Sequence, residues 1–165
     1  MSEVQNIIST FNHYSSWLST LEEMDESLWF KPIAEGKWSV SEIIAHIMNW
    51  DHHLLAEILP SVPNETGMEF PDFDTYNNKA SNYAKSGISP SKLLIEAKDK
   101  RKLLIKELNK LPTAKLTQPL PANNVTHCPH TGTPYSLIYI VKKFTDHDHH
   151  HKKQMIQFLK KNNLD

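Results

Sequence analysis

The segment HDHHH, residues 147–151, holds four of the ten histidines of the chain. His147 and His151 stand four residues apart, so on an α-helix both face the same side, one turn apart, and can reach one metal ion. In helical phase His151 lies in the middle of an apolar stripe and His147 at its edge, whereas the two histidines between them point towards solvent. The alternative is a pair of core histidines hydrogen-bonded to other side chains, and the spacing alone does not choose between the two.

His46 is the candidate for a third ligand. It lies at the flank of the apolar stripe of an earlier expected helix, where a lone histidine is usually structural or half-exposed. Three imidazoles would leave open positions on a tetrahedral or octahedral ion. Open positions accept water or substrate, which is typical of catalytic rather than structural metal sites.

Helical periodicity dominates the chain and predicts the elements that must carry these histidines. Helices are expected over residues 3–26, 39–59, 75–84, 89–111 and 133–162. Ser39 and Glu42 fit a capping box at the start of the second helix. Ser89 and Thr133, each followed by proline, are the expected N-caps of the last two. Pro60 is expected to end the second helix.

The four longer helices can bury their apolar stripes only against one another. The fold class is therefore all-α, a four-helix bundle, with residues 1–165 as one domain. The long connecting loops 60–73 and 112–132 indicate crossover connections.

Composition excludes several classes of protein. The net charge of −1 argues against a nucleic-acid partner, and the paired lysines near the C-terminus fit the solvated face of a helix. No apolar run approaches the ~18 residues of a membrane span. The single cysteine, Cys128, excludes an intrachain disulfide. We therefore expect a cytoplasmic protein with no membrane partner.

Two segments resemble motifs of a known family. KWSVSEIIAHIMNWD (residues 37–51) resembles the second-helix motif of the DinB-like, or YfiT-like, metalloprotein superfamily, and HDHHHKKQM (residues 147–155) resembles its fourth-helix motif. Residues 72–108 resemble the middle section of that family, with Asn77 where an asparagine commonly follows an aromatic residue. The resemblance covers nearly the whole chain, in order.

This resemblance implies an antiparallel four-helix bundle with a metal ion on its axis. It carries the role of metal ligand onto His46, His147 and His151. Members of the family hold nickel, zinc or other divalent metals, so nickel or zinc is expected here. Three neutral imidazoles suit either ion, and the donor set does not choose between them.

Other residues near these motifs have less certain roles. Asp148 is expected either to hold an imidazole N–H or to be an ordinary surface carboxylate. Trp38 and Trp50 flank His46 in sequence and can line a pocket, although core packing is the favoured interpretation. Asn77 is a further candidate for the surroundings of the metal.

His52, His53 and Gln154 are expected at the helix surface, with interhelical hydrogen bonding as the alternative for Gln154. His127, Cys128 and His130 could in principle bind zinc, but they lack the spacing of a zinc knuckle, so a second site is disfavoured. Cys128 has no assignable helix N-terminus or charge partner, which makes it a weak candidate nucleophile.

Characterised relatives include thiol S-transferases that use bacillithiol or mycothiol, and a mycothiol-dependent maleylpyruvate isomerase. The resemblance thus implies a metal-dependent enzyme that activates a low-molecular-weight thiol such as bacillithiol towards a small-molecule substrate. A carboxylate-bearing thiol would need lysines near the metal, because Arg101 is the single arginine. The alternatives are a hydrolase that uses a metal-bound water, and a non-enzymatic metal-binding stress or interaction module. A homodimer is a further expectation, since such bundles often pair side by side.

Overall fold

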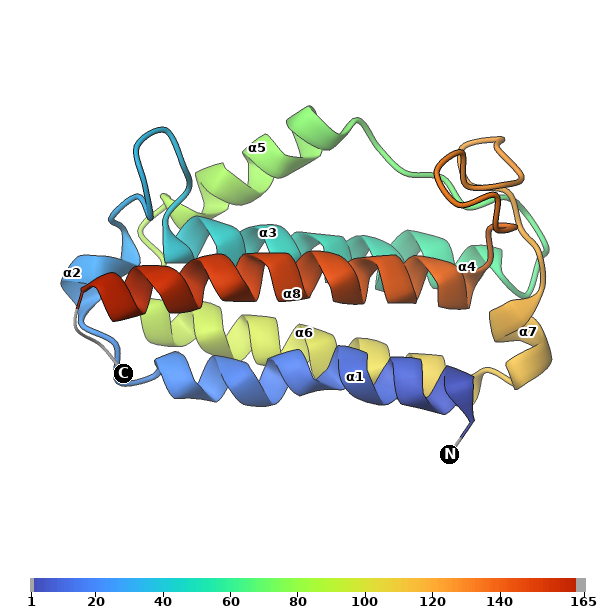
Figure 1. Cartoon of the computed structure of the whole chain (residues 1–165), viewed down its shortest axis with the longest axis horizontal. Coiled ribbons are helices and arrows are strands. Elements are labelled where there is room, and N and C mark those ends of the chain that lie inside the picture. Colours follow the sequence, from blue (N-terminus) through green and yellow to red (C-terminus); the bar gives the residue numbers. More distant parts are fainter. Residues whose placement is uncertain (1, 163–165) are drawn as a thin grey trace.

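The computed structural model describes residues 2–162, in which four long helices lie alongside one another (Figure 1). They are α1 (Glu3–Leu18), α3 (Val40–His53), α6 (Pro90–Lys110) and α8 (Leu137–Lys161). α1 and α8 run in one direction, and α3 and α6 run in the opposite direction (Figure 1). α3 packs on α6, α6 on α1, and α1 on α8. The expected all-α four-helix bundle is confirmed, and within residues 2–162 the only β-pairing consists of isolated bridges.

Shorter elements connect the long helices. They are a 3₁₀ turn (Ser19–Leu21), α2 (Glu26–Trp29), a π-helical turn (Leu54–Ile58), α4 (Leu59–Ser61), α5 (Phe73–Ala84) and α7 (Thr113–Thr117). α5 lies against α3, on the outer side of the bundle (Figure 1). No helix among the described residues is long and apolar enough to cross a membrane.

Side-chain caps set the phase of α3, the helix that carries His46. The Ser39 hydroxyl accepts the backbone N–H of Glu42 at 3.2 Å, and the Glu42 carboxylate accepts the backbone N–H of Ser39 at 3.2 Å. This is the predicted capping box. Ser89 caps α6 in the predicted way, by accepting the N–H of Lys92 at 3.2 Å.

Two helix ends differ from the expectation. The first helix stops at Leu18 instead of continuing to residue 26. A 3₁₀ turn follows it, and Asp25 then caps the separate helix α2 by accepting the N–H of Ser27. The last helix begins at Leu137 with Ser136 as its N-cap, not at Thr133. Residues 126–135 are held instead in an extended loop.

Pro60 does not end the second helix. The backbone passes through a π-helical turn before Pro60 and remains helical to Ser61. The wider π-helical turn changes the hydrogen-bonding register just where proline supplies no N–H, so the helix is deformed instead of broken.

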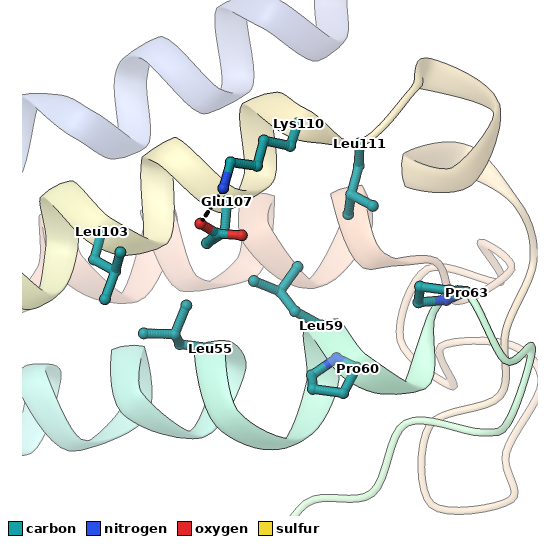
Figure 2. Close-up of a pocket in the computed structure, with 8 residues that line it drawn as sticks. All are labelled: Leu55, Leu59, Pro60, Pro63, Leu103, Glu107, Lys110 and Leu111. Atoms are coloured by element: carbon teal, nitrogen blue, oxygen red, sulfur yellow. Dashed lines mark hydrogen bonds and ion pairs between the residues drawn. The ribbon is translucent and has the colours of Figure 1, made fainter.

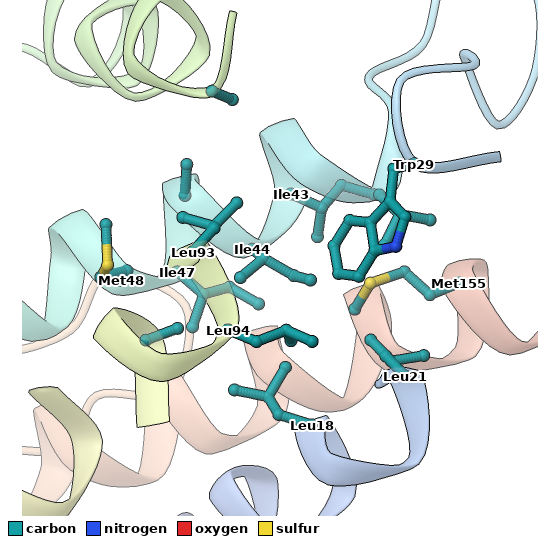
Figure 3. Packing of buried hydrophobic residues seen from close by; sticks show 14 of the residues in the cluster. Leu18, Leu21, Trp29, Ile43, Ile44, Ile47, Met48, Leu93, Leu94 and Met155 are labelled. Carbon is teal, nitrogen blue, oxygen red and sulfur yellow. The ribbon is translucent and has the colours of Figure 1, made fainter. Parts of the chain in front are cut away.

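The core divides into two apolar clusters along the bundle axis. One includes Leu18, Trp29, Ile43, Leu94 and Met155 (Figure 3). The other includes Phe11, Leu54, Leu104, Leu108 and Val141. Along α3, α6 and α8 in turn, Asp51, Arg101 and Asp148 fall between the members of the two clusters.

The two long connections, from α4 to α5 and from α7 to α8, meet at the end of the bundle where α8 begins. The backbone N–H of Met68 donates to Pro121 O at 2.8 Å, and the N–H of Asn123 donates to Met68 O at 2.8 Å. Leu120 is joined in turn to Tyr135 by a backbone hydrogen bond of 2.9 Å. These bonds hold the two loops as one wall beside α3 and α8.

Candidate metal centre

Three imidazoles converge between α3 and α8. His147 Nε2 lies 2.9 Å from His46 Nε2 and 3.1 Å from His151 Nε2. One ligand nitrogen from each ring lies within 4.8 Å of the other two. Among residues 2–162, these three histidines are the one set of at least three potential ligand side chains that lie close enough together to share a metal ion. The structure therefore brings together the three histidines singled out from the sequence.

Hydrogen bonds determine which ring nitrogens face the cluster. His46 Nδ1 lies 3.0 Å from Asn77 Oδ1, and His151 Nδ1 lies 2.9 Å from Gln154 Oε1. An amide oxygen only accepts hydrogen bonds, so in both rings Nδ1 carries the proton and Nε2 carries a lone pair. Trp50 Nε1 also donates to Asn77 Oδ1, at 2.9 Å, which supports this orientation of the Asn77 amide.

Two of these lone pairs point at His147 Nε2, which can supply at most one proton when its ring is neutral. A divalent cation satisfies all three nitrogens at once. A Zn–N bond of about 2.0 Å separates ligand nitrogens by about 3.3 Å in a tetrahedral site and by about 2.8 Å in an octahedral one. The two separations at His147, 2.9 and 3.1 Å, fit this range, and the three ligand nitrogens all lie within 4.8 Å of one another.

The electrostatic surroundings keep two of the three rings, those of His46 and His151, neutral. Burial, with the added effect of His147 and His151, lowers the pKa of His46 to about 3. Burial and the neighbouring His147 lower the pKa of His151 to about 4. Both rings are thus unprotonated at neutral pH, which is the state that binds a metal.

His46 is the most enclosed of the three ligand candidates. Its side chain is buried, which is the structural one of the two positions expected from helical phase, whereas His147 and His151 are half-buried. The cause is tertiary: α5 brings Asn77 over one edge of the ring, and the Trp38 ring packs on it with centroids 4.8 Å apart. Trp38 thus packs against the candidate ligands themselves.

Asp148 fits neither of its two expected roles. It is buried, and Oδ2 accepts a hydrogen bond of 2.9 Å from Arg101 Nη2. Its other oxygen lies 3.8 Å from His147 Nδ1, beyond hydrogen-bonding distance but close enough for an electrostatic interaction. The carboxylate therefore connects the histidine cluster to a buried ion pair.

This ion pair was not found from the sequence. Arg101 donates to Asp51 through Nε at 2.8 Å and through Nη2 at 2.9 Å, to Asp148, and to Phe11 O at 2.6 Å. Burial raises the pKa of Asp51 to about 6, although the guanidinium opposes the shift. Helical phase was the sequence signal for the burial of Arg101, because this residue continues the apolar stripe of Ala97 and Leu104 on α6.

The other expectations near the helix surface had mixed outcomes. His52 is exposed, as expected, but His53 is buried and bonds through Nε2 to Glu69 O at 2.7 Å. The linker that follows α4 folds back over His53, which helical phase cannot show. Gln154 bonds within its own helix, to His151, instead of between helices.

A cavity of about 530 Å³ opens beside the histidines. His46 and His147 line it, and His151 does not. Its other lining residues come from α3, α5, α8 and the joined loops: Trp50, Phe70, Phe73, Asn77, Ala122, Asn123, Val125, Pro129, Tyr135, Ile140, Lys143 and Phe144. Among these described residues no carboxylate appears, and Lys143 is the one ammonium group.

A second hollow, of about 450 Å³, lies between α6 and the π-helical turn with α4 (Figure 2). Its wall consists mainly of leucines and prolines. The charged groups there, Glu107 and Lys110, pair with each other at 2.8 Å (Figure 2). The one carboxylate of this hollow, Glu107, is thus paired with Lys110, and among the described residues it belongs to no group of potential metal ligands.

Cys128 is buried in the loop that precedes α8. Hydrogen bonds from the hydroxyl groups of Tyr139 and Thr131 lower the pKa of its thiol to about 6. These partners could not be assigned from the sequence. His127 and His130 are exposed and do not join Cys128 in a metal-compatible group among the described residues.

Comparisons with known proteins agree with this architecture. No curated protein sequence matches the chain significantly. Among solved structures, the chain is similar to YfiT from Bacillus subtilis, described as a probable metal-dependent hydrolase with an unusual four-helix bundle topology. The TM-score is 0.76 at 18% identity, over 100% of this chain and 91% of YfiT. The family model of the DinB superfamily matches residues 12–155, and the chain belongs to that superfamily.

Proposed function

We propose that the protein is a metal-dependent hydrolase in which His46, His147 and His151 hold one divalent ion, zinc or nickel. The observation that carries this proposal is the convergence of three Nε2 atoms, two of them held as lone-pair donors by Asn77 and Gln154. The description of YfiT as a probable metal-dependent hydrolase supports the reaction class. A divalent ion at such a site supplies Lewis acidity and lowers the pKa of a water molecule to about 7.

The residues of the chain have separate tasks in this proposal. Asn77 and Gln154 keep His46 and His151 in the tautomer that binds metal. The aromatic wall of the cavity binds the substrate and excludes bulk water. Because His46 and His147 line the cavity, a substrate bound there lies next to the ion. This access favours an enzyme over a non-enzymatic metal-binding module, which needs no such cavity.

Thiol S-transfer is the alternative reaction for the same centre. A thiol that carries several carboxylates, such as bacillithiol, needs matching cations. Arg101 cannot serve, because it is completely buried and already bonded to Asp51 and Asp148. Lys143 is the one ammonium group that lines the cavity. This shortage of cations favours hydrolysis over transfer of such a thiol.

The first test is metal content. The protein, purified without a polyhistidine tag, is compared with His46→Gln, His151→Gln and the control His149→Gln, whose side chain is exposed on α8. We expect near-stoichiometric zinc or nickel in the parent and the control, and loss from the other two variants. Metal retained in both His46→Gln and His151→Gln would refute the proposed ligands.

The second test is activity towards aryl esters and amides. Hydrolysis should disappear with a chelator and return with zinc or nickel. A metal-loaded protein that hydrolyses none of them, but joins a low-molecular-weight thiol to an electrophile, would establish the alternative reaction.

A further inference from the structure

The cavity beside the histidines has an aromatic interior. The Trp50 ring lies at the centre of this aromatic group. Its centroid is 5.4 Å from that of Phe73, with an angle of 89° between the ring planes, and 6.0 Å from that of Phe144, with an angle of 82°. Phe70 completes the group, 6.5 Å from Trp50. Edge-to-face rings of this kind leave aromatic faces available to a flat ligand.

The rim of the cavity remains unusually apolar for a surface. Phe73 is 60% exposed and Val125 is 46% exposed, and both line the cavity. Large apolar side chains that are kept in water next to a concave site typically mark a binding surface. The volume of about 530 Å³ suits a small molecule with one or two rings.

One charged side chain breaks this apolar wall. Lys143 lies on α8 four residues before His147, so its side chain is on the same helix face, about 6 Å away along the helix axis. Its Nζ lies 5.3 Å from the centroid of the Tyr139 ring. Among residues 2–162, no carboxylate is within ion-pair distance of Lys143. A side-chain hydrogen bond with Tyr139 raises the pKa of Lys143, and because no carboxylate among these residues pairs with the ammonium group, it can still pair with an anionic ligand.

We propose that this cavity selects an aromatic substrate that carries one anionic group. The ring packs against the aromatic wall that Trp50, Phe73 and Phe144 form, and the anion pairs with Lys143. The bond to be cleaved is directed towards His46 and His147. The separation of one helical turn between Lys143 and His147 matches the length of a single aromatic ring. The position of the cleaved bond rests on the proposed hydrolase function, whereas selection of the anion does not.

Binding of three matched probes tests this selection. They are 2-naphthoate, 2-naphthylmethanol and 2-naphthylmethylammonium, which share a ring system and differ in charge. Dissociation constants are measured by calorimetry on protein treated with a chelator, so that no carboxylate can bind a metal ion. We expect naphthoate to bind about tenfold more tightly than the alcohol, from one charge-assisted hydrogen bond, and the ammonium probe to bind least tightly.

Variants identify the residues responsible. Lys143→Gln should abolish the preference for naphthoate and leave the affinity for the alcohol unchanged. Lys142→Gln is the matched control, an exposed lysine on the same helix that does not line the cavity, and it should keep the preference. Phe73→Ala should weaken all three probes, because Phe73 contributes aromatic surface and no charge.

Three results would overturn the proposal. The first is equal binding of the anionic and cationic probes, and the second is a preference for naphthoate that survives Lys143→Gln. The third is a preference that appears only with added zinc, which would mean that the carboxylate binds the ion directly. If instead the parent protein binds no metal but keeps a Lys143-dependent preference, the hydrolase function fails and the anion selectivity stands.

Discussion

Asp148 accepts a hydrogen bond of 2.9 Å from Arg101, and both side chains are buried where the two apolar clusters of the bundle meet. The same guanidinium binds Asp51, so one positive charge faces two carboxylates. Through the 3.8 Å separation between Asp148 Oδ1 and His147 Nδ1, this network reaches the candidate metal centre. The ion pair therefore links the stability of the bundle to the environment of a proposed ligand.

Arg101→Met should lower the free energy of unfolding by about 3–5 kcal/mol, because it leaves two buried carboxylates without their cation. Urea denaturation of the metal-free protein measures the change. Lys102→Met is the matched control, since Lys102 is exposed on the same helix. A loss below about 1 kcal/mol, the range of a surface pair, would show that the carboxylates do not depend on Arg101.

Asp148→Asn should weaken zinc binding about tenfold while the protein remains folded. Asparagine can still accept the hydrogen bond from Arg101, but it removes the negative charge next to His147. Zinc affinity is measured by competition with a chromophoric chelator. Asp146→Asn, an exposed carboxylate on α8, should bind zinc like the parent. Equal affinities in both variants would contradict an electrostatic role for Asp148.

Asn77→Ala should also lower zinc affinity, by about tenfold, because His46 Nδ1 and Trp50 Nε1 both lose their acceptor. Without it, the His46 ring is free to change tautomer or to rotate. Asn78→Ala is the control, since Asn78 is exposed one position further along α5. Unchanged zinc affinity in Asn77→Ala would remove Asn77 from the site.

The metal-free protein should lose stability as the pH falls from about 6.5 towards 4. An unfolded histidine titrates near 6.5, whereas burial lowers the folded-state pKa to about 3 for His46 and about 4 for His151. Below pH 6.5 the unfolded chain therefore binds more protons than the folded one, and acid favours unfolding. Above about pH 6.5 both histidines are neutral in the folded and the unfolded state, so they do not change the stability with pH.

At pH 5 the expected loss is about 1 to 2 kcal/mol for each histidine, with the lower value for the partly exposed His151. Urea denaturation at pH 7 and pH 5, in the presence of a chelator, measures it. His46→Gln should reduce the pH dependence, and His149→Gln should leave it unchanged. A parent protein with equal stability at both pH values would contradict the lowered pKa values.

Local signals were enough for several parts of the prediction. The capping box at Ser39 and Glu42 set the start of α3, and the four-residue spacing of His147 and His151 put both on one face of α8. Such features depend on residues three or four positions apart, so they are visible in the sequence and survive folding unchanged. The resemblance to the DinB-like family then indicated His46, which helical phase alone did not favour.

Other features arise only when distant segments meet. The burial of His46 depends on Asn77 from α5 and on Trp38 before α3, and the burial of His53 depends on the linker that follows α4. The cavity is shaped by loops that join through Met68, Pro121 and Asn123. Helical periodicity contains no information about which loop covers which face.

The amino-acid sequence by itself determined the four long helices, the caps at Ser39 and Ser89, and the placing of two histidines one turn apart on one helix face. These features follow from hydrogen bonds and periodicity within a helix. Only the tertiary structure decided that Arg101, Asp51 and Asp148 form a buried ion pair, and that an aromatic cavity opens beside His46 and His147. A charged residue on an apolar stripe is stable only if its partners come from other helices, and those partners are known only once the bundle has packed.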